Sequence, residues 1–146
     1  MYMTRIIITV LLTTWAIPFL WAQETLLLRE PNISKTHITF TYGNDIWVAD
    51  LDGQNVKRVT STPAADRHPM FSPDGQTIAF SSNRSGVYSV YTVSIEGGSP
   101  KRLTWHPSGS RVRGWSVDGS RILYASPRDY APKPSFCLWT IPKDGG

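Results

Sequence analysis

The sequence predicts an all-β protein made of repeated four-stranded units, the arrangement of a β-propeller. Glycine and proline, with 11 residues each among 146, recur every few positions and leave no long window for a helix. Three sequence blocks also return in a fixed order, with offsets of 40 and 44 residues between Ile38, Ile78 and Ile122. A period near 40 to 45 residues, with several short strands in each period, is typical of a propeller blade.

The first strand of a unit and the turn after it are clearest in the second unit. Residues 69–72 are predicted to form a short strand, and S-P-D-G at 72–75 follows as a tight turn. Proline supplies the φ near −65° that the turn requires, and glycine accepts a positive φ at little cost. The third unit keeps Asp118-Gly119 after Val117, whereas the first has Ser34-Lys35 and the least typical turn.

The second strand of each unit alternates apolar and polar residues. It reads I-T-F-T-Y, I-A-F-S-S and I-L-Y-A-S at 38–42, 78–82 and 122–126. Because alternate residues of a strand share a face, Ile78 and Phe80 are predicted to be core. Phe40, Phe80 and Tyr124 occupy one repeat position, so each is expected to be buried against a neighbouring sheet. Phe40 and Tyr124, in the end units, are expected to lose most from missing neighbours.

The third and fourth strands come from two further blocks. The third contains Trp47, Tyr91 and Trp139, each six residues before a glycine, and the fourth is K-R-V-T at 57–60 and K-R-L-T at 101–104. We interpret the paired basic residues as solvated strand positions. The net charge of +4 has no long run of Lys and Arg behind it, so we expect no nucleic-acid partner.

Residues 1–22 are predicted to be a secretory signal peptide. Arg5 precedes an uncharged apolar stretch, and Ala22 is a small residue before the polar Gln23. The alternative is an uncleaved membrane anchor, because the stretch approaches the length that spans a bilayer. The protein is therefore expected to be exported, periplasmic or extracellular, or membrane-anchored if the segment is retained.

Residues 23–146 are predicted to be the amino-terminal fragment of a propeller. The blades fall at about 31–60, 69–104 and 112–146, and the last is incomplete. Propellers have about four to eight blades, so we expect this sequence to be part of a longer polypeptide, with the remainder of that polypeptide as one partner.

No catalytic or metal-binding constellation is found in the sequence. Gly114-Trp-Ser116-Val-Asp118 fails the nucleophile motif G-x-S-x-G at its last position. His37, His68 and His106 lack the close spacing of metal ligands, so structural roles are expected for them. We therefore predict no catalytic residue, no metal and no cofactor in this chain.

Arg113 and Trp115 are the candidate binding residues. Gly114 between them permits a close backbone approach, on a strand expected near the propeller axis. Arg113 could then hold a peptide carboxylate. The alternative is that Trp115 is a core residue equivalent to Phe71, with Arg113 merely solvated.

The blocks resemble the propeller repeats of TolB and of the large serine peptidases called tricorn proteases. The S-P-D-G turn, R-L-T at 102–104 and I-W-V-A-D-L-D-G at 46–53 also occur in propellers of prolyl-oligopeptidase-type enzymes, so they specify only a blade. Residues 103–126, with L-T-x-H-P followed by V-x-G-W and an x-D-G hairpin, resemble the tricorn pattern more narrowly. Residues 26–34 resemble the start of that family's first propeller. Val117 in place of proline and the proline-rich loop at 129–135 depart from it.

The resemblance implies the function of an accessory domain. In tricorn-type enzymes the catalytic Ser and His lie far downstream, and the six-bladed first propeller is taken to admit and guide peptides. The expected partners are thus peptides or proteins, with homo-oligomers formed through the longer polypeptide. A non-enzymatic, TolB-like periplasmic docking propeller and the propeller of a prolyl-oligopeptidase-like hydrolase are the alternatives.

Overall fold

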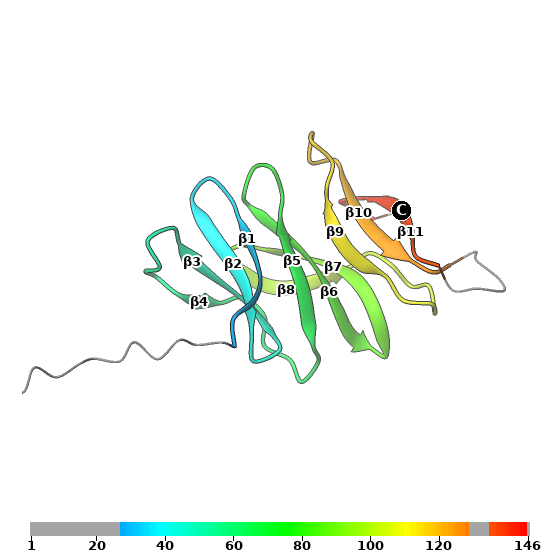
Figure 1. Cartoon of the computed structure of the whole chain (residues 1–146), viewed down its shortest axis with the longest axis horizontal. Helices are drawn as coiled ribbons and strands as arrows, with labels where there is room; N and C mark the ends of the chain where they lie inside the picture. Colours follow the sequence, from blue (N-terminus) through cyan, green and yellow to red (C-terminus); the bar gives the residue numbers. More distant parts are fainter. Residues whose placement is uncertain (1–26, 129–134, 146) are drawn as a thin grey trace, which may run out of the picture.

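The computed structural model describes residues 27–128 and 135–145. Its eleven elements over these ranges are all β-strands (Figure 1). None of the described residues belongs to a helix that could cross a membrane. The predicted signal peptide and most of the proline-rich loop lie outside the described residues.

The strands form three antiparallel sheets in chain order, which we call blades 1 to 3. Blade 1 contains β1 (Arg29–Ile33), β2 (His37–Tyr42), β3 (Asp45–Asp50) and β4 (Lys57–Arg58). Blade 2 contains β5 (Asp66–Phe71), β6 (Thr77–Ser85), β7 (Val87–Ser94) and β8 (Gly97–Arg102). Blade 3 contains β9 (Arg111–Trp115), β10 (Arg121–Ser126) and β11 (Cys137–Pro142). Within each blade every strand pairs with the next in sequence, which confirms the predicted all-β, partial propeller.

The turns between the first two strands of each blade are held by short polar side chains. In blade 2, Ser72 Oγ donates to Asp74 Oδ1 at 2.5 Å, and Gly75 has a φ of +72°. In blade 3, hydrogen bonds from Ser116 and Ser120 lower the pKa of Asp118 to about 2. The charged carboxylate therefore fixes this turn even though Val117 replaces the proline.

The core lies between the blades, because the middle sheet is apolar on both faces. Ile78 and Phe80 are 0% exposed, which confirms their prediction as core. They belong to a first interface cluster shared with blade 1, which consists of Ile46, Val48, Val59, Phe71, Ile78, Phe80, Tyr91, Val93 and Ile95. The opposite face contributes to a second interface cluster shared with blade 3, which consists of Ala79, Val90, Leu103, Val112, Ile122, Tyr124 and Ile141.

Phe40 and Tyr124, in the end blades, were both expected to lose burial. This expectation is confirmed for Phe40 and wrong for Tyr124. Tyr124 is only 3% exposed, because its face of blade 3 packs against blade 2. Phe40 is only partly buried, because the equivalent face of blade 1 points away from blade 2. The large aromatic position of blades 2 and 3 thus faces the preceding blade, and blade 1 has no such neighbour among the described residues.

The repeated K-R-x-T block links strands and blades. Arg58 Nη2 donates to Asp45 Oδ2 at 2.6 Å, which ties β4 to the start of β3. Lys57 Nζ donates to Glu96 Oε2 at 2.8 Å and so joins blade 1 to blade 2. Lys101 Nζ likewise donates to the Asp144 carbonyl of blade 3 at 2.8 Å. These residues are strand positions open to solvent, as interpreted from the sequence, and their contacts to other strands and blades are an addition that the sequence did not predict.

Candidate functional site

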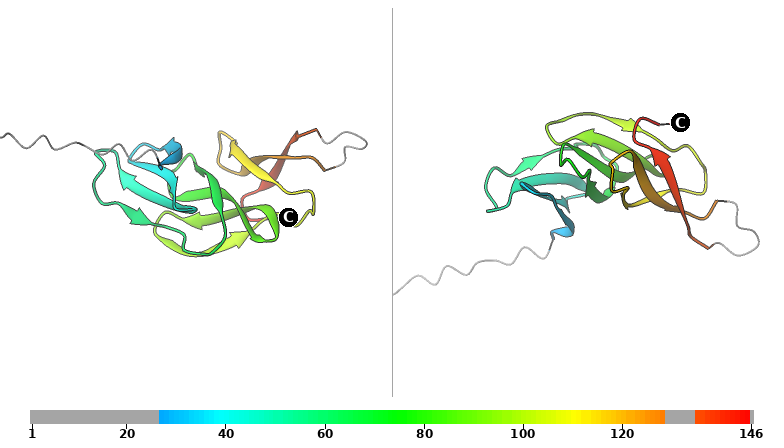
Figure 2. Two further views of the ribbon diagram at one scale, coloured as in Figure 1. Left: turned by 60° about the horizontal axis from the view of Figure 1, so that its bottom comes forward. Right: turned by 90° about the horizontal axis from the view of Figure 1, so that it is seen from above.

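The first strands of the three blades, β1, β5 and β9, lie side by side and are here called the inner strands. β5 packs between β1 and β9, and the three sheets fan out from these strands (Figures 1 and 2). In a propeller the blades surround a central channel, so a ligand that passes along the channel would lie beside the inner strands. Each inner strand also carries an irregularity in its pairing with the next strand.

Two of these irregularities are joined by one carboxylate. Glu30 on β1 and His68 on β5 have φ values of +54° and +53°, uncommon for residues other than glycine. Glu30 Oε2 accepts hydrogen bonds from the His68 backbone N at 2.7 Å and from Thr41 Oγ1 at 3.2 Å. Glu30 Oε1 lies 3.5 Å from His68 Nε2. Both oxygens of the Glu30 carboxylate therefore face groups at the junction of blades 1 and 2.

The His68 ring lies in a positively charged part of the inner strands. Burial is the largest cause that lowers its pKa below the ordinary 6.5, and Glu30 opposes this effect. Arg67, Arg111 and Arg113 lower the pKa further through charge repulsion. The ring is therefore neutral at pH 7, and the arginines outnumber the carboxylate near it.

The structure separates the two predicted binding residues. The Trp115 ring packs against the second interface cluster, and its Nε1 donates to the Met70 carbonyl at 2.9 Å. Arg113 is exposed at the irregularity of β9. A Cβ added to Gly114 would meet nothing within 4 Å, so the backbone there borders open space. Whether either side chain binds a ligand stays a prediction.

Trp115 and Gly114 line an open groove of about 560 Å³, which we call the upper groove. It runs across the ends of the inner strands, where they lead into the hairpin turns at the upper edge of Figure 1. Its rim carries exposed apolar side chains, with Ile33 66% and Val117 98% exposed. The other lining residues are Asn32, Ser34, Lys35, Met70, Phe71, Ser72, Pro73 and Ser116.

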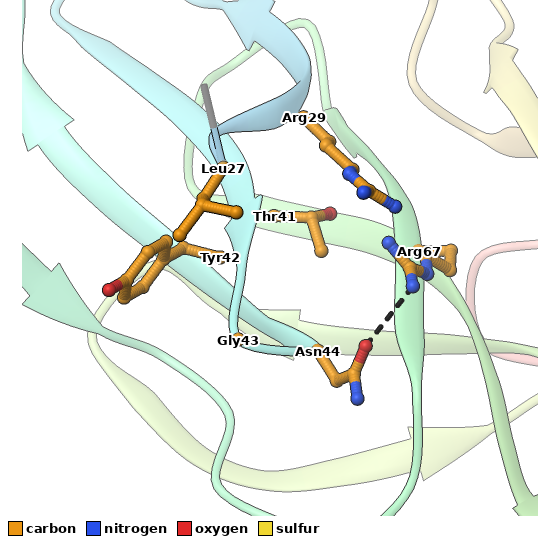
Figure 3. A pocket seen from close by; sticks show the side chains of 7 residues that line it. All are labelled: Leu27, Arg29, Thr41, Tyr42, Gly43, Asn44 and Arg67. Atoms are coloured by element: carbon orange, nitrogen blue, oxygen red, sulfur yellow. Dashed lines mark hydrogen bonds between the residues drawn. The ribbon is translucent and has the colours of Figure 1, made fainter. Parts of the chain in front are cut away.

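A second hollow, the arginine cleft, lies at the opposite end of β1 and β5. It has a volume of about 360 Å³ and is lined by Leu27, Arg29, Thr41, Tyr42, Gly43, Asn44 and Arg67 (Figure 3). Sequence reasoning missed both arginines. Their equivalence appears only in the structure, where Arg29 pairs with Thr41 and Arg67 with Ser81, which are equivalent positions of the second strands.

Metal chemistry finds no support in the part of the chain that is described. Over residues 27–128 and 135–145, no three His, Cys, Asp or Glu side chains gather as a metal site. The upper groove, the arginine cleft and the charge along the inner strands are the features considered for function.

Comparison with known proteins places these features in a family. The model of the tricorn protease N-terminal β-propeller domain matches residues 25–146. Tricorn protease homolog 1 of Streptomyces coelicolor is 38% identical over 64 residues, 44% of this chain and 6% of that protein. The Tol-Pal system protein TolB of Bordetella pertussis is 46% identical over 39 residues, 27% of this chain and 9% of that protein.

Solved structures give the same fold. A putative TolB from Agrobacterium tumefaciens superposes with a TM-score of 0.69 at 25% identity, over 81% of this chain and 43% of its own. The crystal structure of the tricorn protease superposes with a TM-score of 0.68 at 24% identity, over 82% of this chain and 12% of its own. The sequence thus spans only a small part of the tricorn proteins it matches. Because the family model covers most of its length, the chain belongs to the family of tricorn protease N-terminal β-propeller domains.

Proposed function

We propose that this chain is the substrate-guiding propeller of an exported tricorn-type serine peptidase. Peptides would pass along the inner strands toward a catalytic domain elsewhere in the polypeptide. The observation that carries the proposal is the upper groove, which opens beside the inner strands of a domain from the tricorn family.

The chemistry of the upper groove suits an extended peptide. Trp115 offers a ring surface held in place by its bond to Met70, and Gly114 leaves room for a main chain to approach. Ile33 and Val117 provide exposed apolar contacts at the rim. Arg113, nearby on β9, is proposed to pair with a peptide carboxylate. Main-chain and apolar contacts of this kind tolerate many sequences, as a guiding surface requires.

Obstruction of the groove tests this role. In a Cys137→Ser background of the protein as its gene encodes it, Val117→Cys would be labelled with a bulky maleimide. We expect slower hydrolysis of long peptides and an unchanged rate for dipeptide substrates, which need less of the path. The matched control is labelled Ser99→Cys, exposed on β8 and absent from the groove lining. Equal rates for the two labelled proteins on long peptides would contradict guidance through this groove.

Docking of partner proteins in the manner of a TolB-like propeller is the second candidate. The 46% identity to TolB over 39 residues and the 0.69 TM-score favour it. The same experiment separates the two functions. A docking protein would hydrolyse neither the long nor the short peptide, with or without the label.

We also propose that the protein is exported, because Arg5 and the apolar stretch before Ala22 have the order of a signal peptide. The mature protein is expected to begin at Gln23 and to be recovered from the periplasm or medium. N-terminal sequencing of the native protein measures this. A mature chain that still began at Met1 in the membrane fraction would instead establish the anchor.

A further inference from the structure

We propose that the arginine cleft binds the carboxylate side chains of acidic peptide segments, so that the protein favours peptides rich in Asp and Glu. The proposal deepens the guiding function, on which its physiological meaning rests. It concerns residues distant from the upper groove and makes no use of Arg113 or Trp115.

Three arginines occupy equivalent positions in the repeat. Arg29 pairs with Thr41, Arg67 with Ser81 and Arg111 with Ala125. These three partners follow the repeated aromatic position by one residue in each blade. One register position of every inner strand is therefore arginine, and all three lie where the inner strands begin, at the lower end in Figure 1.

The first two of these arginines line one cleft. The Arg29 and Arg67 side chains extend from neighbouring strands toward the same space, beside Thr41 and Asn44 (Figure 3). Arg67 Nη2 donates to Asn44 Oδ1 at 3.1 Å, which holds this guanidinium at the cleft. Neither arginine forms a salt bridge with a carboxylate of the described residues.

The charges in the arginine cleft favour an anionic ligand. Two guanidinium groups in one cleft repel each other unless an anion lies between them. Glu30 is the acidic residue nearest in the chain to Arg29, and its two oxygens face His68 and Thr41 instead. The positive field also reaches the His68 ring, whose pKa Arg67 lowers. An anionic ligand would remove the repulsion and accept paired N–H bonds from planar donors.

A repeat-related arrangement lies at the junction of blades 2 and 3. The backbone N of Asp66 donates to the Asn44 carbonyl at 2.8 Å, and that of Ser110 donates to the Tyr88 carbonyl at 2.6 Å. Next to the second contact, Arg111 lines another hollow, of about 290 Å³. Its guanidinium lies 5.8 Å from the Tyr88 ring centroid and 5.4 Å from that of Phe136. A cationic hollow thus lies at each of the two junctions between the described blades, which suits a segment with several carboxylates.

The lining favours a carboxylate carried by a peptide. Leu27 and the Tyr42 ring give the cleft apolar walls against which the methylene groups of a glutamate can pack. The sequence as a whole is cationic at +4, so charge also favours approach of acidic segments.

Binding of a labelled hexaglutamate with an amidated C-terminus tests the proposal, by fluorescence anisotropy at low salt on the protein as its gene encodes it. Arg67→Gln is expected to weaken binding about tenfold, since one charge-assisted contact is lost. The matched control is Arg121→Gln, which removes the same charge from β10, where Arg121 donates to Thr140. The arginine cleft would be supported as the binding site if the Arg121→Gln control retained binding. The unsubstituted protein and the two variants should also have equal melting temperatures.

Several results would overturn it. If Arg67→Gln and Arg121→Gln weakened peptide binding equally, only the net charge of the protein would attract the peptide. If Arg67→Gln did not weaken binding, the arginine cleft would not be the binding site. Capture of a peptide terminus would be indicated if hexaserine with a free carboxylate bound as well as the amidated hexaglutamate. Because this assay needs no hydrolysis, its failure leaves the obstruction experiment unaffected, and an absence of peptidase activity leaves this assay intact.

Discussion

Replacement of Phe80 by alanine is expected to lower the free energy of unfolding by about 3 to 5 kcal/mol. The ring is 0% exposed within the first interface cluster and stacks on Tyr91 with centroids 5.8 Å apart. The cavity left by its removal would lie between two sheets, where neither can shift far without losing other contacts. Urea unfolding of the protein as its gene encodes it measures the change.

The control for this substitution is Gln76→Ala in the exposed turn before β6. It should change the free energy of unfolding by less than about 0.5 kcal/mol, because its backbone contact to Ile95 is retained. A similarly small effect of Phe80→Ala would contradict the packing of blade 2 against blade 1.

Replacement of Asp66 by asparagine is expected to destabilise the fold by about 3 kcal/mol. The Asp66 side chain is 0% exposed, and both of its oxygens accept from Arg84 Nη2, at 3.1 and 2.9 Å. The Arg84 guanidinium also lies 5.4 Å and 4.8 Å from the ring centroids of Phe80 and Tyr91. It is thus confined beside the core, and loss of the carboxylate would leave its charge without a counterion.

Glu96→Gln is the matched control, because it neutralises the carboxylate of an exposed pair. Its partner Lys57 lies at 2.8 Å, but the Glu96 side chain is 80% exposed and solvent screens the attraction. No measurable change in unfolding is expected. Equal losses in the two variants would show that the Asp66 pair contributes no more than a surface contact.

The sequence was sufficient to predict the core face of the second strand in the middle blade. Alternation within residues 78–82 placed Ile78 and Phe80 on one face, and the S-P-D-G turn located the start of their strand. Such signals are local, because they depend on strand period and turn geometry. They do not tell which neighbouring sheet a face meets, so the exposure of Phe40 could not be separated from that of Tyr124.

The arginine register was hidden by the irregular inner strands. Twelve residues separate Arg29 from its partner Thr41, whereas fourteen separate Arg67 from Ser81. Aligning the units on their second strands therefore displaces Arg29 from its equivalents. The partners of Lys57 and Asp66 could not be predicted from the sequence either, because each pair depends on how distant turns and strands meet in space.

The single orientation of the aromatic faces gives the fold a direction of assembly. Each later blade brings its own bulky side chains, such as Phe80 or Tyr124, onto a sheet formed by residues that precede it in the chain. A polypeptide is synthesised or translocated starting with its amino terminus. Each junction between blades can therefore form as soon as the later blade appears, because the earlier sheet is already present. Phe40 is the exception among the described blades, because no described blade precedes its own and its ring is only partly buried. When the blades form in chain order, the aromatic face of blade 1 therefore forms first and is covered last.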